Sequence, residues 1–161
     1  MIDSRGNGAS GAARAYIDGG ARGNPGPAGF GVRIEEPDGT LIQELHGSVG
    51  IATNNVAEYN GLLAALKWAV ENGRSHVEIV ADSELLVKQM RGEYRVKHPG
   101  LQPLVARARL LAAQLDDVTF RHVRRELNKE ADRLSNLGMD AAEEEVKGQR
   151  AKAEGRNQKL F

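Results

Sequence analysis

The chain has 161 residues, and its 22 basic and 22 acidic side chains give a formal net charge of zero. This balance excludes a strongly basic nucleic-acid-binding protein, so any contact with nucleic acid must come from a local patch. The absence of cysteine excludes disulfides and thiolate metal sites, the four histidines lack zinc-ligand spacing, and no stretch has the apolar length of a membrane span, so we expect a cytoplasmic protein.

The first half of the chain predicts an antiparallel meander. We expect residues 1–13 to be a flexible N-terminal lead and residues 14–20 to be a strand that ends at Gly19-Gly20. A loop rich in glycine and proline over 23–27 comes before an alternating strand over 28–36. A Pro-Asp-Gly turn then leads to a third strand over 40–49.

The second half changes to helical spacing. Apolar residues recur at helical intervals over 53–72, with Thr53 or Asn54 as the N-cap and Gly73 as the stop. Further along the chain, we predict strands over 76–81 and 118–123 and helices over 83–90, 101–115 and 128–142. We expect residues 143–161 to form a charged, solvated tail, partly helical or disordered.

These elements predict an α/β fold with a mixed five-stranded sheet flanked by helices. The first three strands are antiparallel. The fourth and fifth should run parallel to the first, because helical crossovers join them.

Four carboxylates fall where one element gives way to another or where a helix starts: Asp18, Glu58, Asp82 and Asp132. Each has an ordinary structural explanation when taken singly, as a turn residue, a cap or an exposed helix charge. If they converge on one rim of the sheet, their mutual repulsion requires cations, and Mg²⁺ is the hard ion that oxygen ligands suit.

Four motifs surround these carboxylates: Ile17–Gly29, Thr53–Tyr59, Ala81–Leu85 and Asn128–Asp132. In residue type, order and spacing they resemble type 1 ribonuclease H (ribonuclease HI) over about residues 14–142. The resemblance implies a ribonuclease H-like fold and an Mg²⁺-dependent endonuclease, with Mn²⁺ as a substitute. It implies that the RNA strand of RNA–DNA hybrids is cut to 5′-phosphate and 3′-hydroxyl ends. Two metal ions would be held by Asp18, Glu58, Asp82 and Asp132.

The resemblance also implies substrate-binding residues, which are Gly19, Gly20, Asn24, Thr53, Asn54, Asn55 and Ser83. Glycines without a β-carbon allow a ligand close to the backbone, where amides can reach the 2′-hydroxyl of RNA. Asn24 can instead be only a turn residue, and Thr53 and Ser83 can serve as caps with or without contacting a phosphate of the DNA strand.

The sequence departs from the family in the loop before the last helix. Many members carry a mobile histidine there, whereas here His122 is predicted to be a structural or surface residue on a strand. The auxiliary role would then fall to nearby residues, for which the candidates are Arg124, Arg125, Glu126 and Asn128.

Two alternatives stay open. The chain could be a non-catalytic hybrid-binding module on the same fold, or a metal-dependent nuclease of the wider superfamily with another substrate. We expect a monomer with no membrane partner.

Overall fold

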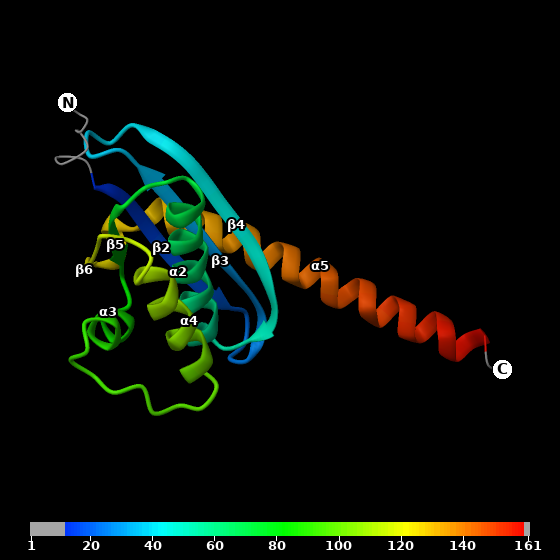
Figure 1. Cartoon of the computed structure of the whole chain (residues 1–161). Helices are drawn as coiled ribbons and strands as arrows, with labels where there is room; N and C mark the ends of the chain where they lie inside the picture. Colours follow the sequence, from blue (N-terminus) through cyan, green and yellow to red (C-terminus); the bar gives the residue numbers. More distant parts are fainter. Residues whose placement is uncertain (1–11, 160–161) are drawn as a thin grey trace.

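The computed structural model describes residues 12–159, which form one twisted sheet with helices on both faces (Figure 1). The strands are β2 (Ala13–Ala21), β3 (Gly26–Glu35), β4 (Leu41–Ala52), β5 (His76–Ala81) and β6 (Asp117–His122). The helices are α2 (Asn54–Glu71), α3 (Glu84–Met90), α4 (Gln102–Ala112), the short 3₁₀ helix η1 (Arg125–Leu127) and α5 (Lys129–Lys159). Within residues 12–159 no helix combines the length and apolar character needed to cross a membrane.

The strand order is β4-β3-β2-β5-β6. Strands β2, β3 and β4 pair antiparallel, while β5 lies parallel to β2 and β6 parallel to β5. This confirms the predicted mixed sheet and the parallel direction of its last two strands. Ile17 pairs with Ala81 across β2 and β5, so the next residues, Asp18 and Asp82, lie at the same edge of the sheet.

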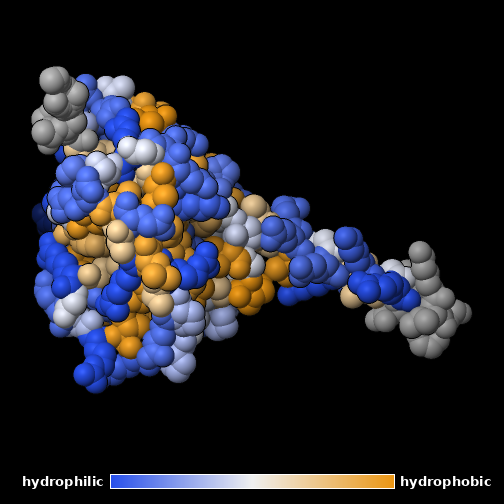
Figure 2. Space-filling model, in the orientation of Figure 1, coloured by the Kyte–Doolittle hydropathy of each residue, from blue (hydrophilic) through white to orange (hydrophobic). Residues whose placement is uncertain are grey.

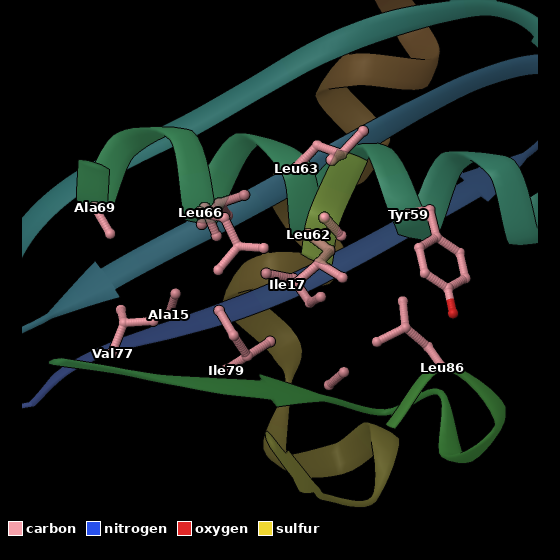
Figure 3. Packing of buried hydrophobic residues seen from close by; sticks show 14 of the residues in the cluster. Ala15, Ile17, Tyr59, Leu62, Leu63, Leu66, Ala69, Val77, Ile79 and Leu86 are labelled. Carbon is pink, nitrogen blue, oxygen red and sulfur yellow. The ribbon is translucent and has the colours of Figure 1, made fainter. Parts of the chain in front are cut away.

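The main core lies between the sheet and α2 (Figure 3). On β2 the side chains of Ala13, Ala15 and Ile17 are buried at every second position, as expected for a strand with one face on the core. Helix α2 buries Leu62, Leu66 and Ala69 against this face, and α4 packs on its outer side. The first turn of α2 is thereby held against the edge of the sheet that carries Asp18.

Helix α5 covers the other face of the sheet, and glycines allow it to lie close (Figure 1). A β-carbon added at Gly31 would lie 2.4 Å from the backbone nitrogen of Ser135, and one added at Gly29 would lie 2.2 Å from the carbonyl carbon of Gly138. Neither distance is sterically possible, so these positions require glycine. The close contact places the first three turns of α5 directly against β3.

Several predicted boundaries were wrong. Strand β3 begins at Gly26 rather than residue 28, and β4 ends at Ala52 rather than 49, because Gly26 and Ala52 pair across the two strands. Ala13, assigned to the lead, already belongs to β2; residues 1–11 of that lead lie outside the described residues.

The largest difference concerns the last helix, which runs to Lys159 and not to residue 142. Its distal sequence is rich in alanine, glutamate, lysine and arginine, all strong helix formers. The segment from residue 143 therefore continues α5, which leaves the body beyond Glu145 with a surface of mainly hydrophilic side chains (Figure 2).

Candidate active site

The four carboxylates meet in one pocket of about 510 Å³. Asp18 comes from β2, Glu58 from the second turn of α2, Asp82 from the residue after β5, and Asp132 from the first turn of α5. The other lining residues are Gly19, Gly20, Asn54, Asn55, Arg125, Ser135 and Met139. The predicted convergence on one edge of the sheet is therefore present.

Two caps fix the helix starts beside the pocket. Thr53 accepts a hydrogen bond from the backbone nitrogen of Val56 at 3.3 Å, and Ser83 accepts one from Leu86 at 3.2 Å. The start of α2 also presses on β2, because a β-carbon at Gly19 would lie 2.3 Å from the carbonyl carbon of Ala57. Glycine at position 19 thus lets α2 bring Glu58 up to Asp18.

Burial and like charge both raise the pKa values of two of these carboxyls, Asp18 and Glu58. Burial raises the pKa of Asp18 to about 8, and the neighbouring charge of Asp82 adds to the effect. Burial likewise raises the pKa of Glu58 to about 7, although a hydrogen bond from Ser83 opposes the change. The protein alone therefore does not favour ionisation of both Asp18 and Glu58 at neutral pH.

The chemistry of this donor set fits a hard divalent cation. All four groups offer carboxylate oxygens, which Mg²⁺ and Mn²⁺ prefer, and a cation would remove the penalty for ionising them together. Within residues 12–159, no cluster of three or more acidic or histidine side chains is arranged to hold a metal ion as it stands. The suitability of this site for a divalent cation therefore rests on the carboxylate oxygens that it offers and on their negative charge.

Two side chains from the α5 region hold the carboxylates in place. Asn128 is 1% exposed, and its Nδ2 donates to the carbonyl oxygen of Ile17 at 2.9 Å and to Oδ2 of Asp82 at 3.1 Å. The buried hydroxyl of Ser135 lies 3.3 Å from Oδ2 of Asp18 and 2.9 Å from the carbonyl oxygen of Asp132. Asn128 was predicted as an auxiliary residue, and its contacts are those of a positioning residue.

Sequence reasoning missed Ser135 and Met139. Both lie on the face of α5 that carries Asp132, three and seven residues further along the helix. That helical spacing is the signal that could have identified them.

Most of the residues predicted to bind substrate line the carboxylate pocket or the pocket beside it, and Asn24 and Asn54 also form hydrogen bonds between chain segments. Gly19, Gly20, Asn54 and Asn55 line the pocket itself, and Ser83 lies in an adjoining pocket with Asn55 and Glu58. Asn24 accepts a hydrogen bond from the backbone nitrogen of Asn54 at 3.0 Å, and Oδ1 of Asn54 accepts one from Ala21 at 2.8 Å. These two bonds tie the glycine-rich loop to the start of α2.

Of the auxiliary candidates, Arg125 lines the pocket. Arg124 is exposed, and Glu126 and Asn128 line a separate pocket of about 250 Å³ beside the start of α5. His122 is exposed at the end of β6 and is outside the residues that line the carboxylate pocket, as expected for a surface histidine.

The sequence and the fold of this chain are similar to those of known proteins. Residues 16–138 match the family described as reverse transcriptase-like. A bifunctional protein of Mycobacterium tuberculosis is 48% identical over 126 residues, which are 78% of this chain and 35% of that protein. This chain therefore spans about a third of the length of that relative.

Two solved structures are also similar. The N-terminal RNase H domain of a Mycobacterium tuberculosis protein, solved as a fusion with maltose-binding protein, is 44% identical with a TM-score of 0.81, and the match covers 84% of this chain and 99% of that one. LC11-RNase H1, solved in complex with an RNA/DNA hybrid, is 41% identical with a TM-score of 0.76 and coverage of 81% and 98%.

Proposed function

This chain belongs to the type 1 ribonuclease H family, and we propose that it is an endonuclease that hydrolyses the RNA strand of RNA–DNA hybrids. The observation that carries the proposal is the meeting of Asp18, Glu58, Asp82 and Asp132 in one pocket. The hybrid in the LC11-RNase H1 structure supports this choice of substrate. Monomeric action in the cytoplasm remains part of the proposal.

The cofactor in this proposal is Mg²⁺, two ions per site, with Mn²⁺ as a substitute. Asp18, Glu58, Asp82 and Asp132 would be the ligands. When bound, the ions supply Lewis-acid activation of water and stabilisation of the leaving oxygen. The pKa values of Asp18 and Glu58, raised to about 8 and about 7, indicate that ion binding must release protons at neutral pH.

The chain itself supplies orientation and charge. Asn128 and Ser135 hydrogen-bond to the carboxylates of Asp82 and Asp18, so they limit the orientations that these two ligands would adopt toward an ion. Arg125 on the pocket wall offers guanidinium donors to the charge that develops on the attacked phosphate. In the proposed step a water oxygen forms a bond to phosphorus while the bond from phosphorus to the 3′ oxygen breaks. The water loses a proton and the 3′ oxygen gains one, which leaves a 5′-phosphate and a 3′-hydroxyl.

Recognition of the hybrid would use the glycine-rich loop and the start of α2. Gly19 and Gly20 line the pocket, where a backbone amide can contact a 2′-hydroxyl of the RNA strand. Asn54 and Asn55 add side-chain amides at the same rim. Such readout of shape and backbone predicts little sequence preference.

A substrate panel tests the proposal. With Mg²⁺, the protein should cut the RNA of a hybrid but neither double-stranded RNA nor double-stranded DNA, and end analysis should find 5′-phosphates. Tight binding without cutting in either Mg²⁺ or Mn²⁺ would instead support the binding-module alternative. Cutting of duplex DNA or double-stranded RNA in preference to the hybrid would support a nuclease of the wider superfamily.

A further inference from the structure

Helix α5 continues far beyond the site, and its exposed part differs in charge from the body. We define the cationic arm as residues 146–159, which contain Lys147, Arg150, Lys152, Arg156 and Lys159 against one acid, Glu154. Five cations and one acid give the arm a formal charge of +4, so the rest of this neutral chain carries −4. The charge of the molecule is therefore strongly divided between body and arm.

The course of the arm is set by contacts just before it. Arg22, in the glycine-rich loop, forms ion pairs with Asp140, at 2.6 Å, and with Glu143, and it also donates to the side chain of Asn136 at 3.1 Å. On the neighbouring side, Ser48 donates to Glu145 at 2.7 Å. The Arg22 bonds fix α5 to the segment that follows β2, and the Ser48 bond fixes it to β4, so the arm leaves the body beside these two elements.

The first part of the same helix runs along the site. Asp132, Ser135 and Met139 line the pocket over two successive turns, so the axis of α5 passes beside the pocket. Beyond Glu145 the residues from Lys147 to Glu154 are all exposed (Figures 1 and 2). The arm therefore continues the line of the site into solvent with no packing partner among the described residues.

Three cations of the arm are exposed: Arg150, Lys152 and Arg156. Lys147 pairs with Glu144 at 3.5 Å, but Arg150, Lys152 and Arg156 form no ion pair within the described part of the chain. Lys152 and Arg156 are four residues apart and share a face of the helix, while Glu154 between them lies on the opposite face. Two exposed cations on one face suit a ligand with regularly spaced negative charges.

We propose that the cationic arm binds backbone phosphates of the hybrid outside the cleavage site, through Lys152 and Arg156. This inference rests on the proposed function, because the hybrid is the polyanion that would lie in the pocket at the start of the same helix. Arg156 is 24 residues from Asp132 along the helix. That span is about 36 Å, or roughly ten base pairs of duplex. Contact with the arm thus requires a hybrid that extends about ten base pairs past the pocket.

The test compares Lys152→Ala/Arg156→Ala with wild-type protein by anisotropy on labelled hybrids. Both proteins carry Asp82→Asn, to prevent cutting. On a hybrid of about 30 base pairs, the slope of log Kd against log[KCl] should be smaller by about 1.8 for the arm variant than for the protein with an intact arm, because the variant loses two phosphate contacts. The affinity advantage of wild type should accordingly shrink by about 12-fold between about 50 and 200 mM KCl. A hybrid of about eight base pairs should show no difference.

The matched control is Lys67→Ala/Arg107→Ala, which removes the same charge from exposed positions on α2 and α4. It should bind the long hybrid with the wild-type salt slope. Equal slopes for wild type and arm variant on the long hybrid would overturn the inference, as would an equal effect of the control or an effect that persists on the short hybrid. In a second experiment both proteins keep Asp82 and can therefore cut. The wild-type protein and the arm variant should then cut the short hybrid at equal rates. A wild-type protein that cuts no hybrid refutes the proposed function, which is a separate outcome.

Discussion

Replacing Asp18 with asparagine should make the metal-free protein more stable at neutral pH. Asp18 has an ordinary pKa of 3.8, and burial together with the charge of Asp82 raises it to about 8 in the folded chain. Between these two pH values the folded protein keeps a proton that the unfolded chain releases. The contribution of Asp18 to stability is therefore complete below about pH 4 and decreases as pH rises towards 8.

The size of the effect follows from this difference. Each pH unit above 3.8 costs about 1.4 kcal/mol per group until the folded pKa is reached. At pH 7 this amounts to about 2–4 kcal/mol, since Asp18 keeps partial contact with water. Asparagine occupies nearly the same volume and carries no charge, so Asp18→Asn avoids this penalty. The free energy of unfolding of the variant at pH 7 should therefore exceed that of wild type by this amount.

The assay is urea unfolding in EDTA at several pH values. The advantage of Asp18→Asn should be present at pH 7 and should vanish near pH 4, and added Mg²⁺ should stabilise wild type far more than the variant. Asp38→Asn is the opposite control: a backbone hydrogen bond from Thr40 lowers the pKa of Asp38, so this change should reduce stability at neutral pH. An Asp18→Asn protein that is no more stable than wild type at pH 7 would refute the reasoning.

Three further changes test the surroundings of the site. Asn128→Ala removes the donor to Asp82 and to the Ile17 carbonyl. It should lower kcat by about 10–100-fold and raise the Mg²⁺ concentration needed for half-maximal rate. An unchanged Mg²⁺ titration would contradict the positioning role. Gly31→Ala should destabilise the fold by about 1–3 kcal/mol or more in urea unfolding, whereas Gly148→Ala, with open space around it, should not; equal stability of the two variants would be evidence against the close α5 contact. His122→Ala should retain most cleavage activity, and a loss as large as that of Asp82→Asn would show that this exposed histidine takes part in the reaction.

The sequence predicted the elements whose boundaries are set by local chemistry. Strand β5 has the predicted bounds, and the start of α2 is capped by Thr53, because capping and alternation depend on near neighbours. The convergence of the four carboxylates was also predicted, since strand ends and helix starts meet at one edge of a mixed sheet. Their roles in catalysis, like those of the substrate-binding residues, stay predictions.

Features that depend on distant contacts were not predicted. The start of β3 at Gly26 depends on pairing with Ala52, which no local pattern shows. Ser135 serves the site only because Gly31 lets α5 approach the sheet, and Asn128 proved to be a buried bridge between Ile17 and Asp82. The length of α5 is a different case, because it follows from a local feature: the strong helix formers after residue 142 continue the helix that was predicted to end there.

The most direct test of the proposed activity is cleavage of an end-labelled RNA–DNA hybrid with Mg²⁺, compared with the same reaction in EDTA and with the Asp82→Asn protein. Asp117→Asn, which removes a charge from an exposed position at the start of β6, serves as the matched variant. We expect wild type and Asp117→Asn to cut the RNA strand alone, and both the EDTA reaction and Asp82→Asn to leave it intact. Cleavage by Asp82→Asn at the wild-type rate, or cleavage that persists in EDTA, would contradict the assignment of the four-carboxylate pocket as the active site.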